Sequence, residues 1–490
     1  MPLLRSLTSR DPLPRAAALA ILALYIVAVA SVALQHEPWR DEADAWLVAR
    51  DAGPADLWYF VRHGGTPALW YVLLIPLAKG GAPYGAQEAL HVAIACGSAA
   101  IVLLASPFPR IARVLLPFSY YFGYEYAVVA RSYALSVLLL LIIAALHEKR
   151  HVRPLPYAIA VALLANTNIH SLAIAALIGL AYLLERGRPA AILIMLGGGI
   201  LAVAQVWPTG DSMVHGAISV FHPDATAQAI RDAFFPMIII TPRVVGVAFG
   251  VAIFLAAAWA VRRSRLALLV LLGSLAFYGY LFVFKWFGGL RHTGFVLLAV
   301  LFALWIGDRS KSAVAWTLLT IALAASVVGS AYVWRLDWKY AFSGAKEMAE
   351  FIKKSGMESY TIAAHSETTT SALCPYFDHP FWFAGIEEFG TYSKWDSKFA
   401  RGLEVTYPEA VDRVVAHFPD RSRVLLLLNV EMPSPEKNGW RLLYHNRRPQ
   451  FANFDESFWL YFGVRSVICD FSYEEESVST RAIKNLKSQT

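Results

Sequence analysis

The chain has 490 residues, of which 57% are hydrophobic and only 16% are charged. Charged residues make up about a quarter of an ordinary soluble domain, so this composition excludes a soluble globular protein and indicates a chain that crosses a membrane many times. The net charge of +7 does not indicate nucleic-acid binding, because the Lys and Arg residues form short clusters between apolar runs and not one basic stripe.

The first apolar run covers 16–34 and follows three arginines. A signal peptide is one interpretation, with 28–30 (AVA) as a cleavage-like triplet. The run is about 19 residues long, which exceeds a usual signal core and is enough to span a bilayer. We therefore expect an uncleaved membrane anchor with its N-terminus in the cytoplasm.

Ten further apolar segments of spanning or near-spanning length follow, which predicts about eleven membrane-crossing helices. These segments are 86–105, 114–127, 133–147, 155–166, 170–184, 189–207, 244–260, 266–284, 292–306 and 313–334. Every second connection is basic. The basic turns contain Arg110/Arg113, Lys149/Arg150/Arg153, Arg186/Arg188, Arg262/Arg263/Arg265 and Arg309/Lys311. The positive-inside rule places all of these turns in the cytoplasm.

The run 67–77 (PALWYVLLIPL) resembles a span but is only about 11 residues long and contains Pro76. If it crossed the membrane, every later loop would change sides. We therefore expect an embedded or interfacial helix within one large outer loop, 35–85. The same alternation places four other connections outside: 124–132, 166–170, 208–236 and 285–292. Because the spans that flank 166–170 are short, this turn should lie in a cavity below the outer surface.

After about Arg335 the composition becomes that of a globular α/β domain. Its predicted helices are 343–356, with Ser343 as N-cap, and 407–418; its predicted strands are 360–364, 423–429, 440–446 and 458–464. The chain thus divides into a transmembrane domain (1–334), an extracytoplasmic α/β domain (335–470) and a polar tail (471–490). Cys374 and Cys469 could form one disulfide bridge if this domain is extracytoplasmic.

An acidic motif opens the outer loop, with Asp41, Glu42 and Asp44 close together. A carboxylate in a partly dry pocket below the head-groups has its pKa raised towards the working pH, so it can act as a general base. The alternative is an interfacial helix whose apolar residues, Trp46 among them, face lipid while the acids face water.

Two cationic positions are predicted on the same side as the acidic motif. Arg131 begins one apolar run, and the pair Arg291-His292 precedes another. Arginine pairs with phosphate oxygens through two parallel hydrogen bonds, so these positions suit a membrane-anchored phosphate. The alternative is that each one only anchors its helix at the membrane surface.

Several further side chains are candidates for the same outer pocket. His63 lies in the outer loop and His170 in the sunken turn; the tyrosines of 120–126 could form an interfacial belt or a sugar-stacking wall. Loop 208–236 carries acids and histidines, but their spacing matches no metal site, and we expect a mobile loop with Asp224 capping a short helix. The chain has no phosphate-cradling Gly loop, nucleophile elbow or Cys/His metal spacing, so we predict neither a metal nor a cofactor.

These features together resemble a known family. The order is an anchor, an outer loop that opens with Asp-Glu, a Gly-Thr-Pro-x-Leu-Trp-Tyr element, an Ala-Arg-Ser-Tyr-Ala-Leu span start, many spans and an outer C-terminal domain. This order is similar to the GT-C glycosyltransferases, particularly the protein O-mannosyltransferase-like (glycosyltransferase family 39-like) and lipid A aminoarabinose transferase-like enzymes. The resemblance covers about 16–334.

The resemblance implies an inverting transfer of sugar from a polyprenyl-phosphate donor to a glycan, lipid or protein acceptor, outside the plasma membrane of a bacterium. Asp41 matches the family's catalytic acidic residue, with Glu42 as its partner. Arg131 and Arg291 match positions near the donor phosphate. Segment 63–71 matches a His-Pro-Pro-Leu-Tyr-Tyr element, with Gly64, Gly65 and Thr66 intervening. The remaining candidates for substrate binding are His63, Tyr133, His170 and His292.

Two alternatives belong to other functional classes. A transporter or flippase for lipid-linked sugars would also need charges in its spans, but repeated halves and broken midplane helices are not visible in the sequence. A non-catalytic anchor that displays the C-terminal domain would not need eleven spans and a polar outer cavity. We therefore expect an enzyme embedded among membrane lipids, without a nucleic-acid partner.

Overall fold

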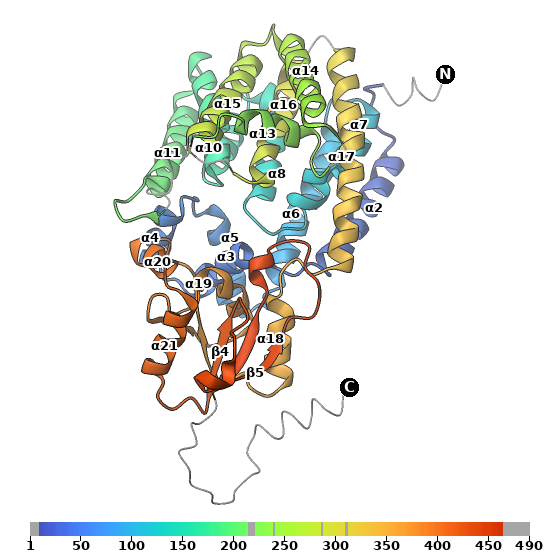
Figure 1. Cartoon of the computed structure of the whole chain (residues 1–490). Coiled ribbons are helices and arrows are strands. Elements are labelled where there is room, and N and C mark those ends of the chain that lie inside the picture. Colours follow the sequence, from blue (N-terminus) through green and yellow to red (C-terminus); the bar gives the residue numbers. More distant parts are fainter. Residues whose placement is uncertain (1–8, 214–220, 239–240, 286–287, 309–311, 464–490) are drawn as a thin grey trace, which may run out of the picture. The chain divides into compact units, whose positions relative to one another are not determined.

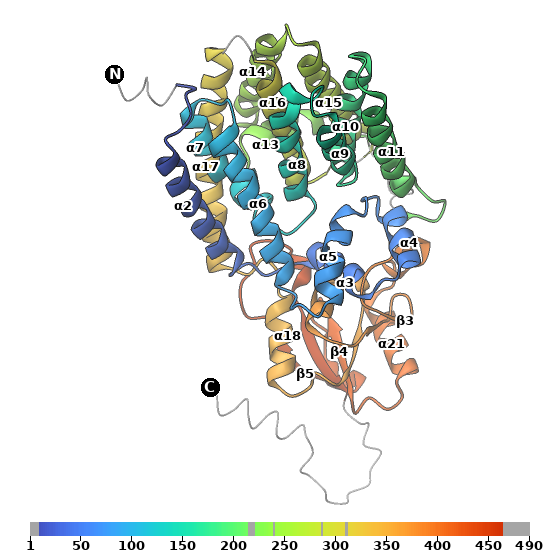
Figure 2. The same ribbon diagram turned by 180° about the vertical axis from the view of Figure 1, so that it is seen from behind.

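A computed structural model describes residues 9–213, 221–238, 241–285, 288–308 and 312–463 (Figures 1 and 2). Contacts divide the chain into two units. The first comprises Met1–His36 and Gly53–Trp338, and the second comprises Glu37–Ala52 and Lys339–Thr490. The expected boundary near residue 335 therefore differs from this division in one respect: the acidic motif groups with the C-terminal unit.

Long apolar helices dominate the first unit. Among the described residues, seven helices are long and apolar enough to cross a membrane: α2 (Arg15–Ala33), α6 (Ala86–Ala105), α11 (Pro189–Val206), α14 (Arg243–Val261), α15 (Arg265–Phe284), α16 (Leu290–Gly307) and α17 (Ala313–Lys339). Shorter apolar helices are α5 (Leu69–Lys79), α8 (Tyr133–Leu146), α9 (Pro154–Ala165) and α10 (Ile169–Leu184). Ten of the eleven predicted segments thus coincide with one helix each, and the chain is an integral membrane protein.

The predicted span 114–127 is wrong as a continuous helix. The structure has α7 (Arg110–Phe118), a break, and then a π-helical turn, Tyr121–Glu125. Pro117 lies inside α7 and lacks a backbone N–H, which favours a break after it. Side chains bind the backbone of this break: Trp334 Nε1 donates to the Gly123 carbonyl at 2.9 Å, and the Tyr25 hydroxyl donates to the Phe122 carbonyl at 2.7 Å. Irregular backbone at membrane depth is tolerated when the protein satisfies it in this way.

The remaining helices of the first unit are short. They are α4 (Pro54–Gly64), the 3₁₀ turn His147–Lys149 and α13 (Ala225–Phe234). Asp224 precedes α13 as predicted but its side chain does not cap it. The backbone of Asp224 is helical, with φ −91° and ψ −3°, and its carboxylate accepts a 2.7 Å hydrogen bond from Arg243 instead.

The second unit contains α3 (Arg40–Asp51) and a six-stranded sheet in the order β3-β2-β1-β4-β6-β5. The strands are β1 (Thr361–Ala364), β2 (Phe381–Phe383), β3 (Glu388–Gly390), β4 (Val424–Leu428), β5 (Trp440–His445) and β6 (Trp459–Gly463). β1 runs parallel to β2 and β4, whereas the other pairs are antiparallel. The four predicted strands are confirmed; β2 and β3, with three residues each, are too short to show a periodic pattern.

Helices surround this sheet. They are α18 (Ala345–Lys354), α19 (Glu367–Thr370), α20 (Ser397–Gly402) and α21 (Tyr407–His417), with 3₁₀ turns at Ser371–Tyr376, Pro435–Asn438 and Phe454–Glu456. α21 packs Val411 and Val414 against a core that includes Trp382, Leu426 and Tyr461. The expected cap of α18 shifts by one residue, to Gly344. Cys374 is buried and free, while its proposed partner Cys469 and the tail 471–490 lie outside the described residues.

Close packing of α9 against α11 generates a stability prediction. A Cβ atom added at Gly198 would lie 2.5 Å from the Cβ and 2.7 Å from the Cα of Ala162, so α11 would have to move. Gly197 and Gly199 have nothing within 4 Å of such an atom. We expect Gly198→Ala to destabilise the protein by about 1–3 kcal/mol. Gly197→Ala should be neutral or stabilising by up to about 1 kcal/mol. Thermal unfolding in detergent measures both, and equal shifts would contradict the packing argument.

Candidate functional site

The predicted site residues belong to both units. Asp41 and Glu42 lie on α3 in the second unit, whereas the two arginines, Tyr133 and the three histidines lie in the first.

Asp41 lies in the first turn of α3 and is half-buried. A helix N-terminus attracts negative charge, so the position favours an ionised carboxylate. Glu42 is fully buried, and its Oε2 accepts a 3.3 Å hydrogen bond from the backbone N–H of Trp39. Glu42 therefore caps the helix that carries Asp41.

Arg40 fixes the same turn of α3 to the rest of the second unit. Its guanidinium hydrogen-bonds Asp455 and lies 3.7 Å from Glu456 Oε1. The backbone N–H of Arg40 also donates to Glu456 Oε1, at 3.3 Å. Sequence reasoning missed both acids, because they lie more than 400 positions from Arg40 and no local pattern pairs them.

The body of α3 is packed inside the protein, so the alternative of an interfacial helix with a lipid-facing apolar side is wrong. Ala43, Trp46 and Leu47 are all buried, and α3 contacts the turn Ser371–Tyr376. Asp44 is also buried and accepts a long hydrogen bond, 3.5 Å, from the Ser393 backbone.

Glu367 is a buried acid that sequence reasoning did not select. Its side chain is on α19, the residue is 4% exposed, and its Oε2 has no hydrogen-bond partner among the described residues. Burial raises the pKa of Glu367 to about 8, and the charges of Asp44 and Asp396 add to the rise. A carboxyl group in this environment is kept neutral by its surroundings near pH 7.

The second set of candidates gathers around His292 in the first unit. His292 occupies the third position of α16, and its Nδ1 accepts a 2.8 Å hydrogen bond from the backbone N–H of Gly289. A neutral ring that accepts at Nδ1 carries its proton on Nε2. Nε2 lies 3.1 Å from the Tyr133 hydroxyl, so His292 donates to Tyr133. The hydroxyl proton of Tyr133 then remains for another acceptor.

His170 stacks on His292, with ring centroids 5.0 Å apart, and equally closely on Phe295. Its Nε2 is buried and has no hydrogen-bond partner within the described part of the chain. Asn168 caps α10 at this point by accepting a 2.9 Å hydrogen bond from the Ser171 backbone. The turn 166–170 is therefore buried within the protein, and it presents a polar ring atom towards the interior. Its depth below the outer membrane surface stays a prediction.

Both predicted arginines belong to this set. The Arg131 guanidinium lies 5.9 Å from the centroid of the Tyr133 ring. Arg131 and Arg291 are each close enough to act electrostatically on the His292 ring. The structure therefore brings together five of the predicted residues: Arg131, Tyr133, His170, Arg291 and His292. We call these five the His292 cluster.

His63 makes a different set of contacts. Its Nδ1 bonds the Tyr59 carbonyl at 2.7 Å, and its Nε2 bonds Asp211 at 3.0 Å. Both partners are hydrogen-bond acceptors, and the bond from His63 lowers the pKa of Asp211. Ser212 donates to the His63 carbonyl at 2.9 Å. His63 thus fastens the start of loop 208–236 to α4; His215 lies outside the described residues.

The tyrosines of 120–126 form neither a lipid-facing belt nor an exposed wall. Tyr120, Tyr121, Tyr124 and Tyr126 are all buried. The Tyr121 hydroxyl lies 2.8 Å from the Thr293 hydroxyl, and Tyr126 donates to the Arg291 carbonyl. Tyr121 and Tyr126 therefore support the first turn of α16, which carries Arg291 and His292.

Within the described ranges, no three His, Cys, Asp or Glu side chains are grouped so that they could hold a metal ion. No family model matches the sequence, and no curated protein matches it.

Solved structures do match the fold. One is the crystal structure of ArnT, a lipid A aminoarabinose transferase, from Cupriavidus metallidurans bound to undecaprenyl phosphate. It has 12% sequence identity and a TM-score of 0.56, over 92% of this chain and 99% of that chain. The apo state of the same protein matches with 12% identity and a TM-score of 0.51, over 93% and 100%. The predicted fold, a GT-C-like multi-pass membrane protein with a C-terminal α/β domain, is confirmed.

Glu367 generates a prediction about pH. Its folded pKa of about 8 lies above its ordinary value, so the folded state binds more protons between about pH 4.5 and pH 8. Stability should therefore fall as pH rises through this window, by at most about 1.4 kcal/mol per pH unit. Glu367→Gln removes this titration. The melting temperature of the variant minus that of wild type should therefore increase as the pH is raised from 5 to about 9.

The matched control for this pH series is Glu388→Gln. Lys398 lowers the pKa of Glu388, so the stability difference between that variant and wild type should change only at acidic pH and stay constant above it. A constant difference between Glu367→Gln and wild type across the series would show that Glu367 does not titrate in this window.

Proposed function

We propose that this chain, which has the fold of ArnT, is a membrane glycosyltransferase. It transfers a sugar from a polyprenyl-phosphate carrier to an acceptor hydroxyl on the extracytoplasmic side, with inversion at the anomeric carbon. The likeness to a structure bound to undecaprenyl phosphate supports a polyprenyl-phosphate donor. The observation that carries the proposal is the His292 cluster, which gathers two arginines and an available Tyr133 hydroxyl proton beside buried aromatic rings.

The His292 cluster has the chemistry to bind the donor phosphate. When the sugar departs, negative charge develops on the oxygen that joins the phosphate to the anomeric carbon. Arg131 and Arg291 neutralise this charge, and the Tyr133 hydroxyl donates a hydrogen bond to a phosphate oxygen. The chain of hydrogen bonds from Gly289 through His292 orients Tyr133 before the donor binds. Orientation fixed in advance avoids reorganisation during the reaction.

Asp41 acts as the general base in this proposal. It takes the proton of the acceptor hydroxyl, and the resulting oxygen attacks the anomeric carbon from the face opposite the phosphate. The bond between the anomeric carbon and the phosphate oxygen breaks, the new glycosidic bond forms, and polyprenyl phosphate leaves. Glu42 holds the first turn of α3 and thereby positions Asp41.

The base assignment is tested by Asp41→Asn, which is close to isosteric. We expect transfer to fall by about 10²- to 10⁴-fold while the melting temperature changes little. Glu42→Gln is the matched control, because the amide oxygen of Gln can still accept the Trp39 N–H. It should retain most of its activity. Mass spectrometry of lipid that copurifies with the protein identifies the sugar for the assay; near-normal transfer by Asp41→Asn would remove Asp41 as the base.

The donor assignment is tested by direct binding of undecaprenyl phosphate. Arg131→Ala and Arg291→Ala should each weaken binding by about tenfold or more, since each removes a charged partner of the phosphate. Tyr133→Phe keeps the ring beneath Arg131 but loses the hydroxyl, so we expect a smaller loss. Arg262→Ala, at the end of α14, is the control. Unchanged affinity in all three cluster variants would contradict the phosphate site.

The competing transporter function gives a different result in the same assays. A lipid-linked sugar transporter would bind the carrier through the His292 cluster but would form no glycosylated product with any acceptor. Asp41→Asn would then be without effect on product, because none is made by the wild type.

A further inference from the structure

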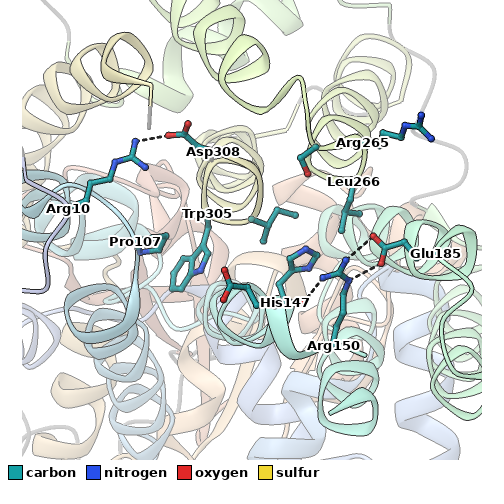
Figure 3. A pocket seen from close by; sticks show the side chains of 12 residues that line it. Arg10, Pro107, His147, Arg150, Glu185, Arg265, Leu266, Trp305 and Asp308 are labelled. Carbon is teal, nitrogen blue, oxygen red and sulfur yellow. Dashed lines mark hydrogen bonds and ion pairs between the residues drawn. The ribbon is translucent and has the colours of Figure 1, made fainter. Parts of the chain in front are cut away.

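A cavity of about 660 Å³ lies in the first unit at the ends of α8 and α16 that are remote from the His292 cluster (Figure 3). The cluster residues lie at the starts of these helices, whereas His147 follows the end of α8 and Asp308 follows the end of α16. At about 1.5 Å per residue, α8 is about 20 Å long and α16 about 27 Å. These lengths approach the hydrocarbon core of a bilayer, which is about 30 Å thick, so the cavity is expected towards the leaflet opposite the His292 cluster.

Two ion pairs hold the walls of this cavity. On one side Arg10 binds Asp308 at 2.6 Å, and on the other side Arg150 binds Glu185 through two hydrogen bonds of 2.8 and 3.0 Å. Figure 3 shows Trp305 and His147 between these pairs. Arg113 also donates to the Arg10 carbonyl at 3.0 Å, which fastens the N-terminal segment as part of the wall. A cavity with walls that are braced in this way is largely formed before any ligand arrives.

The charges that line the cavity balance. Three arginines (Arg10, Arg150 and Arg265) and three acids (Glu148, Glu185 and Asp308) line it. Arg265 is exposed at the edge, and Figure 3 shows its guanidinium pointing away from Trp305 and His147. Within the described part of the chain, Glu148 and Arg265 form no ion pair, so one acid of the lining and one cation at its edge remain for a ligand. A simple anion would meet the acids, and a simple cation would meet the arginines. The lining therefore favours a ligand that carries both charges.

The surface beside the cavity favours a lipid over a soluble ligand. Leu183 and Leu184 immediately precede Glu185, and they are 50% and 70% exposed. The apolar residues Leu266 and Trp305 are part of the lining itself. An acyl chain could therefore lie on the helices while its head-group enters the cavity. The aromatic ring of Trp305 also provides a face for an ammonium group.

We propose that this cavity binds the head-group of a zwitterionic phospholipid that carries a phosphate and a primary ammonium. Glu148 and the Trp305 ring bind the ammonium, and Arg265 and Arg150 bind the phosphate. The bound lipid joins the ends of the four helices α8, α10, α15 and α16, so it stabilises the first unit. The inference does not depend on the proposed transfer reaction.

Lipid selectivity provides the first test, with the full chain purified in detergent and stripped of lipid. We expect phosphatidylethanolamine to raise the melting temperature more than phosphatidylglycerol, which has no ammonium, or phosphatidylcholine, whose methylated ammonium cannot donate hydrogen bonds to Glu148. Acyl chains are kept identical. Equal stabilisation by the three lipids would overturn the proposal. Equal stabilisation by soluble phosphoethanolamine or inorganic phosphate would assign the cavity to a free ligand and would also overturn it.

Substitutions then connect the selectivity to the cavity. Glu148→Gln should reduce the preference for phosphatidylethanolamine over phosphatidylglycerol by about tenfold in Kd, and Arg265→Gln should weaken binding of both lipids. The matched controls are Lys149→Gln and Arg263→Gln, which alter adjacent charges that do not line the cavity. Native mass spectrometry measures the affinities. An unchanged lipid preference in Glu148→Gln, or an equal loss in the control variants, would overturn the assignment.

Discussion

The hydrogen bond from the Gly289 backbone to His292 Nδ1 is the interaction on which the geometry of the His292 cluster depends. A backbone N–H can only donate, so it sets the tautomer of His292 and directs the Nε2 proton at Tyr133. The same bond satisfies an orphan donor at the start of α16, which would otherwise be costly to bury. The same hydrogen bond therefore caps α16 and, through His292, orients Tyr133, a candidate hydrogen-bond donor to a phosphate. His170 supports it by stacking on the other face of the ring.

The need to satisfy backbone polar groups away from water also explains the irregular segment after α7. Pro117 ends regular helix formation, and the carbonyls of Phe122 and Gly123 find partners in Tyr25 and Trp334. Because its backbone carbonyls have these partners, the segment can stay irregular and pack inside the protein next to α16, although its sequence is as apolar as that of a membrane span. Tyr121 and Tyr126 have a structural role, because their hydroxyls bind Thr293 and the Arg291 carbonyl in the first turn of α16.

The interactions that hold Asp41, the candidate base, differ from those that hold the His292 cluster. α3 is fastened at Arg40 by Asp455 and Glu456, and its apolar residues are packed against the C-terminal unit. The C-terminal domain therefore has a role that its sequence did not indicate, since it carries and orients the helix of Asp41. A buried neutral Glu367 next to Asp44 is part of the same packing.

Sequence alone determined the membrane class, the positions of ten helices, the four longer strands and the residue types suited to a phosphate and a base. Hydrophobic periodicity and charge placement are local properties, and they persist whatever the helices pack against. Tertiary structure decided which of the candidates meet. In the folded chain Arg131, Tyr133, His170, Arg291 and His292 lie together. His63 instead forms a hydrogen bond with Asp211, and α3 belongs to the C-terminal unit. These outcomes depend on contacts between residues separated by up to about 400 positions, and such contacts leave no periodic pattern in the chain.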